Sequence, residues 1–222
     1  MLSNFIKFFF FGNYFYGLCA VGLSIEASLQ QSFPLNGLWW YTLVFSCVVL
    51  FYTYAYLTES SPTTSNIRLQ WYAQHRKFIV ASQIFFTAVA AVCIISFALK
   101  NWEAISKTTT LEWILFFSFP SVAAWYYGIN SKRFRKYNLR QIGWLKPFVI
   151  GFVWAGTVTV YPVLFYTLEH NMHYAPTLVG SLLTLKNFMF ISVLCIMFDI
   201  KDYSMDYNQQ IKTFVVKTGI MM

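Results

Sequence analysis

The sequence is poor in charged residues. Of its 222 residues only 11% are Asp, Glu, Lys or Arg, whereas 58% are hydrophobic and 21% are aromatic. Soluble domains carry about 25% charged residues, so this composition excludes a water-soluble globule, which needs more polar side chains to cover its surface. Intrinsic disorder is excluded as well, because disordered segments are poor in hydrophobic residues. The class that remains is an integral membrane protein.

Cysteine is also scarce, and no cleavable leader is visible. The four cysteines, Cys19, Cys47, Cys93 and Cys195, lie inside apolar runs without paired spacing. This pattern predicts packed thiols rather than a disulfide framework or a zinc site. The first apolar run lacks a small-residue cleavage site, so we expect it to remain as a span.

Long apolar stretches recur along the chain. Strands of a membrane β-barrel would be about 10 residues long and would alternate in polarity, whereas these stretches are about twice as long and do not alternate. We therefore predict an all-α fold, a polytopic transmembrane helical bundle with about six spans, in which residues 1–222 form a single transmembrane domain. The predicted spans are residues 5–23, 38–57, 78–99, 113–128, 147–168 and 179–198.

The basic residues lie mainly on one side of these spans. Thirteen Lys and Arg fall in the N-terminal segment, the second and fourth loops and the C-terminal segment, two fall in the third loop, and Lys186 lies inside the last span. By the positive-inside rule both termini are cytoplasmic, and a bacterial inner membrane is the expected location. We interpret the net charge of +8, including the basic run Lys132–Arg140, as a signal of topology and of contact with the lipid bilayer, not with nucleic acid.

Aspartate occurs in one place only. Asp199, Asp202 and Asp206 directly follow the last apolar span. If that helix continues, offsets of three, four and seven residues put the three carboxylates on one face, where they repel one another. Mg²⁺ would relieve the repulsion; the alternative is a solvated helix end. Acids at a cytoplasmic helix C-terminus oppose both the helix dipole and the preference for bases there, which favours a metal site.

Two further groups are weaker candidates. Lys186 inside the last span is either functional or reaches the membrane surface with its long side chain. His170 and His173, three residues apart on the outer side, could offer two metal ligands, which do not by themselves make a metal site.

The motif has a family resemblance. Residues 198–206, FDIKDYSMD, followed by residues 211–219, IKTFVVKTG, resemble the second aspartate motif of the UbiA superfamily of intramembrane prenyltransferases, with Lys212, Thr213 and Gly219 matching its second half. Residues 139–162 are similar to the family's fifth-helix region. The resemblance implies a UbiA-like fold of helices around a cavity. It also implies Mg²⁺-dependent transfer of an isoprenyl group from a polyprenyl diphosphate to a hydrophobic acceptor, either an aromatic ring or a lipid.

The resemblance also assigns site residues. Asp199, Asp202 and Asp206 would hold Mg²⁺, and the diphosphate contacts would be Lys201, Lys212, Arg68 and Lys77. The family's first aspartate motif follows the second span, where this chain offers only Glu59 as a remnant. The sequence shows no counterpart of the family's last three helices. The resemblance therefore implies that the chain is a fragment, that an oligomer or a partner subunit closes the cavity, or that the protein is degenerate.

Two functions therefore stay open at the level of the sequence. One is a membrane prenyltransferase. The other is a catalytically degenerate or truncated UbiA-like membrane protein that acts as a non-enzymatic partner, which the degenerate first motif favours. A small transporter or channel has less support, because Lys186 is the only charged residue in the middle of a predicted span.

Overall fold

The computed structural model of the chain describes residues 2–59, 66–127, 143–201 and 214–218, and these residues form helices and short connections without a strand. Two compact units are present. The first contains residues 1–107 and 168–171, and the second contains residues 108–167 and 172–222. The predicted all-α class is confirmed; the UbiA-like arrangement of the helices stays a prediction.

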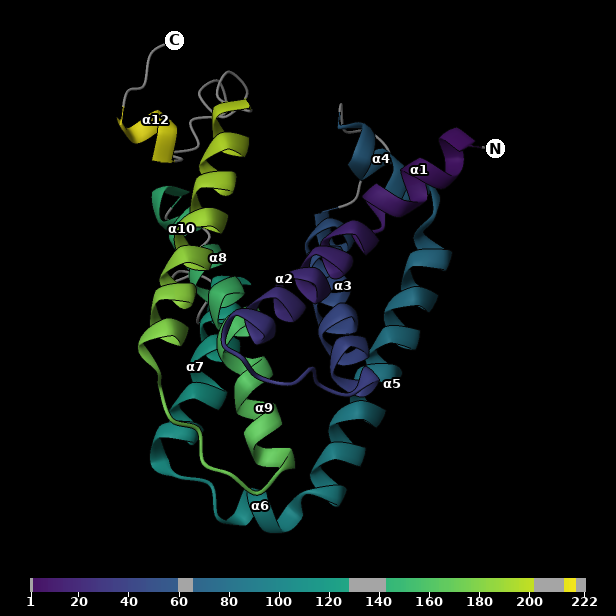
Figure 1. Cartoon of the computed structure of the whole chain (residues 1–222). Helices are drawn as coiled ribbons and strands as arrows, with labels where there is room; N and C mark the ends of the chain where they lie inside the picture. The colour runs from purple at the N-terminus through teal and green to yellow at the C-terminus, as the bar shows by residue number, and fades with distance from the viewer. Residues whose placement is uncertain (1, 60–65, 128–142, 202–213, 219–222) are drawn as a thin grey trace. The chain divides into compact units, whose positions relative to one another are not determined.

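The first unit is built on three long helices (Figure 1). Its elements are α1 (Leu2–Phe11), α2 (Tyr14–Gln30), α3 (Leu38–Glu59), α4 (Ile67–Gln74), α5 (Arg76–Lys100) and α6 (Trp102–Ser106). The central helix α3 packs against both α2 and α5. Trp40 is buried at the contact with α2, where its indole nitrogen donates a hydrogen bond to Ser24 Oγ at 3.0 Å. Apolar packing between helices thus forms this core, with small polar groups satisfied inside it.

The stretch predicted as one span over residues 5–23 is two helices. α1 and α2 meet at Gly12 and Asn13 with a bend of 61°. Asn13 has a φ of 64°, in the left-handed region that asparagine tolerates better than most residues. An α-helix cannot continue through that conformation, so the apolar stretch is divided into two helices at Asn13.

The second unit centres on a pair of helices, α8 (Lys146–Ala155) and α10 (Leu178–Lys201), which pack along each other. Its other elements are α7 (Thr110–Tyr127), η3 (Gly143–Leu145), the π-helical turn η4 (Gly156–Val160), α9 (Tyr161–Glu169) and the short α12 (Phe214–Thr218). Pro162 follows η4. Proline has no N–H, and its ring crowds the carbonyl four residues earlier, so a wider turn just before Pro162 has a local cause.

Several helices are long and apolar enough to cross a membrane. Within the described residues there are four: 38–58, 76–100, 143–169 and 178–200, or five if the bent pair of α1 and α2 counts as one span. The stretch predicted over residues 113–128 is helical as α7, but it does not belong to this set; Pro120 lies inside it and Glu112 in its first turn. These helices are compatible with an integral multi-pass membrane protein.

The outer surfaces of the long helices are apolar. α5 exposes Ile84, Phe85 and Val92, and α10 exposes Leu182 and Phe190. In water such surfaces would associate, whereas a bilayer covers them without cost. The lipid bilayer is therefore the environment that suits both helices.

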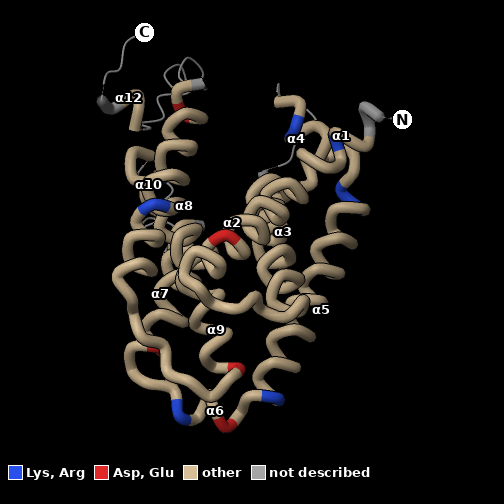
Figure 2. Tube along the Cα trace, in the orientation of Figure 1, with Lys and Arg blue, Asp and Glu red and all other residues tan. Residues whose placement is uncertain are grey.

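Charge in the first unit lies toward the helix ends. Figure 2 shows the basic segments of α1, α4 and the start of α5 at the same end of this unit. In the sequence these belong to the N-terminal segment and the second loop, the two regions of this unit that are predicted to be cytoplasmic. Their proximity agrees with that pairing, and which side of a membrane they face stays a prediction.

The helices α8 and α10 approach each other closely at Gly151. A Cβ at this position would lie 2.8 Å from the carbonyl oxygen of Phe188 and would overlap Ser192 Oγ. Small residues allow such close approach of helices in membranes. We expect Gly151→Ala to lower the free energy of unfolding by about 2 kcal/mol, because the helices must separate.

The matched control is Gly22→Ala in α2, where a Cβ would meet nothing within 4 Å. This change should be neutral or stabilising by up to about 1 kcal/mol, through helix propensity alone. Thermal unfolding in detergent measures both variants. Equal responses of the two would contradict the close contact.

Candidate functional site

Three buried polar side chains of α10 face either α8 or η4. Asn187, Ser192 and Asp199 are all buried. Asn187 Nδ2 donates a hydrogen bond to Thr159 Oγ1 in η4 at 2.8 Å. One oxygen on each of the three α10 residues (Asn187 Oδ1, Ser192 Oγ and Asp199 Oδ2) is buried without a hydrogen-bond partner among the described residues. Unpaired polar atoms in a membrane helix are costly, which marks this face as a candidate site.

Asp199 is the strongest feature of this face. Its side chain is 2% exposed, and Lys146 Nζ donates a hydrogen bond to its Oδ1 at 2.8 Å. Lys146 is the first residue of α8, so the pair joins the ends of the two helices that form the centre of the unit. A buried carboxylate is strongly destabilising without a counter-charge, and Lys146 supplies that charge here.

The predicted aspartate motif begins inside a helix. α10 continues past Phe198 to Lys201, so the expected helical continuation is confirmed as far as Lys201. After the segment 202–213, α12 returns to pack against α10 and η3, with the Phe214 ring 5.6 Å from that of Phe148 and Val215 buried. The helices that flank the motif segment therefore meet at the end of the unit where Asp199 lies.

The remaining motif residues are only partly described. Asp202, Asp206 and Lys212 lie outside the described residues, as does the basic run Lys132–Arg140. Lys201 and Glu59 are the last residues of α10 and α3, and their side chains are likewise not described. In the described parts of the chain, no three His, Cys, Asp or Glu side chains gather into one group. The three-carboxylate magnesium site thus stays a prediction that rests on Asp199 and the sequence.

Arg68 lies in a dense network in the first unit. Its Nη2 donates hydrogen bonds to the carbonyls of Phe10 and Phe11 at 3.3 and 3.2 Å and to Asn13 Oδ1 at 2.5 Å. Its Nη1 donates to Tyr56 Oη at 3.0 Å, and the guanidinium carbon lies 3.9 Å from the centre of that ring. Arg68 therefore donates hydrogen bonds to the last carbonyls of α1, next to the point where the chain bends.

Tyr72 completes this network. It is fully buried, and its hydroxyl donates to the carbonyl of Phe11 at 2.7 Å and accepts from Asn13 Nδ2 at 3.0 Å. Burial raises the pKa of Tyr72, which keeps the phenol protonated as a donor. The network gives Arg68 a structural role that the sequence did not indicate, and its predicted diphosphate contact stays a prediction. Lys77, in the first turn of α5, is exposed.

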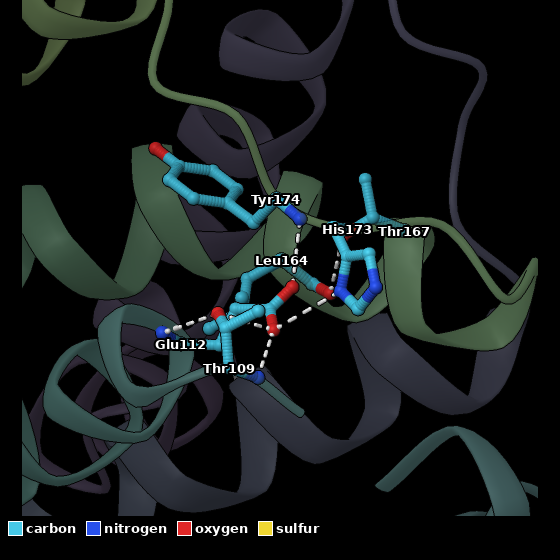
Figure 3. A network of polar contacts seen from close by, with 6 residues as sticks. All are labelled: Thr109, Glu112, Leu164, Thr167, His173 and Tyr174. Carbon is cyan, nitrogen blue, oxygen red and sulfur yellow. Dashed lines mark hydrogen bonds and ion pairs between the residues drawn. The ribbon is translucent and has the colours of Figure 1, made fainter. Parts of the chain in front are cut away.

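A second buried carboxylate lies at the start of α7 in the second unit (Figure 3). Glu112 is fully buried in the first turn of α7. It accepts hydrogen bonds from the backbone N–H groups of Thr109 at 2.6 Å and Tyr174 at 2.7 Å, and from the Thr109 hydroxyl at 2.7 Å. His173 Nδ1 lies 3.6 Å from the same carboxylate. Burial raises the pKa of Glu112, but these donors outweigh it and hold the pKa below its usual value.

The Glu112 cluster is built to stabilise structure. Thr109 and Glu112 form the Thr-x-x-Glu capping box of a helix start, and Tyr174 attaches the connection between α9 and α10 to it. Of the two histidines that were considered as weak candidates for metal ligands, His173 lies beside Glu112. Lys186 is exposed on α10.

Sequence reasoning missed Lys146 as a site residue. The sequence places Lys146 among the basic residues of the fourth loop and within the stretch 139–162 that is similar to the family's fifth-helix region, and neither observation gives it a role in the site. The available signal was its position at the start of an apolar span at the same predicted side as the aspartates. Comparisons of this chain with models of known families, with curated proteins and with solved structures gave no match.

Proposed function

We propose that this protein is a UbiA-like membrane prenyltransferase that binds a polyprenyl diphosphate, with Mg²⁺, at the motif end of α10. The observation that carries the proposal is the state of Asp199, the first carboxylate of the motif. It is buried at the end of a helix long enough to cross a membrane, and one of its oxygens lacks a partner among the described residues. The apolar helices would accommodate the isoprenyl chain, and the polar end the diphosphate.

The donor set at this end suits Mg²⁺, which prefers carboxylate oxygens and diphosphate. Asp199 Oδ2 has capacity for one further positive or hydrogen-bond-donating group. Asp202 and Asp206 would complete the set, with Lys201 and Lys212 as diphosphate contacts. When bound, Mg²⁺ would stabilise the charge that develops on the diphosphate as the carbon–oxygen bond breaks.

The proposal also specifies which segments of the chain face the cytoplasm. If α7 and the bent pair of α1 and α2 cross the bilayer in addition to the four long apolar helices, a cytoplasmic motif end puts both termini and the second and fourth loops in the cytoplasm, as the positive-inside rule requires. The location would then be a cytoplasmic membrane such as the bacterial inner membrane.

The decisive experiment measures binding of farnesyl diphosphate to the protein purified in detergent, with and without Mg²⁺. We expect Mg²⁺-dependent binding that Asp202→Asn weakens at least about tenfold, because a ligand carboxylate is lost. Glu103→Gln, an equivalent change at an exposed carboxylate of α6, should leave binding unchanged. Binding that is independent of Mg²⁺, or equal in the two variants, would overturn the proposal.

The second candidate is a non-enzymatic UbiA-like partner protein. The observation in its favour is that Asp199 and Arg68 are both engaged within the protein, by Lys146 and by the α1–α2 bend. A folded protein that binds no isoprenyl diphosphate in the same assay would support this candidate. Binding together with formation of a prenylated acceptor, detected by mass spectrometry, would exclude it.

A further inference from the structure

The Lys146–Asp199 pair is asymmetric. The Asp199 side chain is 2% exposed, whereas that of Lys146 is 38% exposed. Asp199 sits within the last turn of α10 against α8, and Lys146 reaches it with a flexible four-carbon chain. Any ligand that competes for this carboxylate would therefore displace the lysine and leave the aspartate in place.

The charge balance at Asp199 depends on this lysine. Among the described residues, the other titratable groups that act electrostatically on Lys146 are Tyr126 of α7 and Cys195 of α10. Both types of side chain are ordinarily neutral near pH 7. Lys146 thus supplies the positive charge that the buried carboxylate requires, while Asp199 Oδ2 stays without a partner among the described residues.

We propose that Lys146 is an internal counter-ion, which occupies Asp199 in the ligand-free protein and competes there with a divalent cation. The inference rests on the proposed function, because that function brings the cation to this carboxylate. When a cation takes Asp199, the Lys146 ammonium no longer has its partner and, being partly exposed, is available to an anionic ligand such as a diphosphate. Lys146 then positions Asp199 in the ligand-free protein and binds the anionic ligand in the complex. The Lys146–Asp199 pair thereby disfavours cation binding until the anionic ligand is present.

The test uses Mg²⁺ alone as the probe and thermal stability as the readout, with full-length protein in detergent. Without Mg²⁺, Lys146→Met should lower the melting temperature by roughly 5 °C, because Asp199 is left buried without its counter-charge. Added Mg²⁺ should restore that loss, with an apparent dissociation constant at least about tenfold lower than in the wild type. The double variant Lys146→Met with Asp199→Asn should not respond to Mg²⁺ at this site.

The matched control is Lys186→Met, the same change at an exposed lysine of α10, for which the response to Mg²⁺ should equal that of the wild type. If Lys146→Met does not fold, Lys146→Gln removes the charge but keeps a donor for Asp199 and carries the same expectation.

The outcomes separate the two proposals. An equal Mg²⁺ response in the wild type and the Lys146 variant, lost on Asp199→Asn, would overturn the counter-ion role and leave the magnesium site standing. No Mg²⁺ response in any variant would overturn the counter-ion role, and the binding of farnesyl diphosphate with Mg²⁺ then tests the proposed function by itself.

Discussion

Arg68→Met is expected to lower the free energy of unfolding by about 3 kcal/mol. The change removes three hydrogen bonds, those to the carbonyls of Phe10 and Phe11 and to Asn13 Oδ1. The two carbonyls keep other donors, whereas the fully buried Asn13 oxygen loses its donor, and a buried acceptor left unsatisfied costs about 1–3 kcal/mol. These costs are not additive, and part of the network can recover water at the helix end. Chemical or thermal denaturation in detergent measures the loss.

The location of this effect is also predicted. Hydrogen exchange should accelerate at Gly12 and Asn13, whose N–H groups bond to the carbonyls of Phe8 and Phe10 at the bend. Arg76→Met, at an exposed position at the start of α5, should change stability by less than about 0.5 kcal/mol. A comparable loss in both variants would show that general charge, not the network, is responsible.

Arg68→Lys separates the two roles assigned to Arg68. Lysine keeps the charge but lacks the planar fork that serves several acceptors at once. If Arg68 acts through the bend, this variant should remain destabilised by more than half the loss of Arg68→Met. If Arg68 acts chiefly as a diphosphate contact, the lysine variant should retain both stability and farnesyl diphosphate binding.

Glu112→Ala is expected to cost about 2–3 kcal/mol of stability. The backbone N–H groups of Thr109 and Tyr174 would both lose their acceptor in a buried place. Glu112→Gln keeps an acceptor oxygen and should lose about half as much. Glu103→Ala, at an exposed carboxylate paired only with Lys107 four residues along α6, should be close to neutral.

Glu112 also predicts a pH dependence. Its pKa is lower in the folded protein than the ordinary value of 4.5, so its contribution to stability is fully present above that value and is lost as the pH falls through the folded pKa. The difference in stability between the wild type and Glu112→Gln should therefore shrink as the pH is lowered below 4.5. A difference that stays constant over this range would contradict the role assigned to the carboxylate.

The helical state and the approximate bounds of three long helices could be predicted from the sequence, because the length and hydropathy of an apolar stretch are local properties of the chain. The predicted stretches 38–57, 78–99 and 179–198 correspond to α3, α5 and α10 within three residues at each end. The break at Asn13 was not predicted, because a single Gly-Asn pair inside a long apolar stretch is compatible with a continuous membrane helix. It depends on a left-handed residue and on Arg68, which lies 55 residues further along the chain.

The candidate site also combines a feature that is encoded locally with contacts between residues far apart in the sequence. The Thr-x-x-Glu start of α7 is a local signature, whereas the attachment of Tyr174 to Glu112 joins residues 62 apart. The motif drew attention to Asp199, but its partner Lys146 lies 53 residues earlier. A pairing of that kind depends on how α8 packs on α10, which neither periodicity nor charge patterning encodes.

The bend between α1 and α2 has a consequence for the position of the chain in a bilayer. If α2 runs along the membrane normal, a bend of 61° leaves α1 at 90 − 61 = 29° to the membrane plane. A ten-residue helix is about 15 Å long, so α1 would lie at the level of the lipid headgroups. Its exposed Phe5, Ile6 and Phe10 would then dip into the acyl chains. Because Arg68 stabilises this bend, it would also set how deeply the first unit lies in the bilayer.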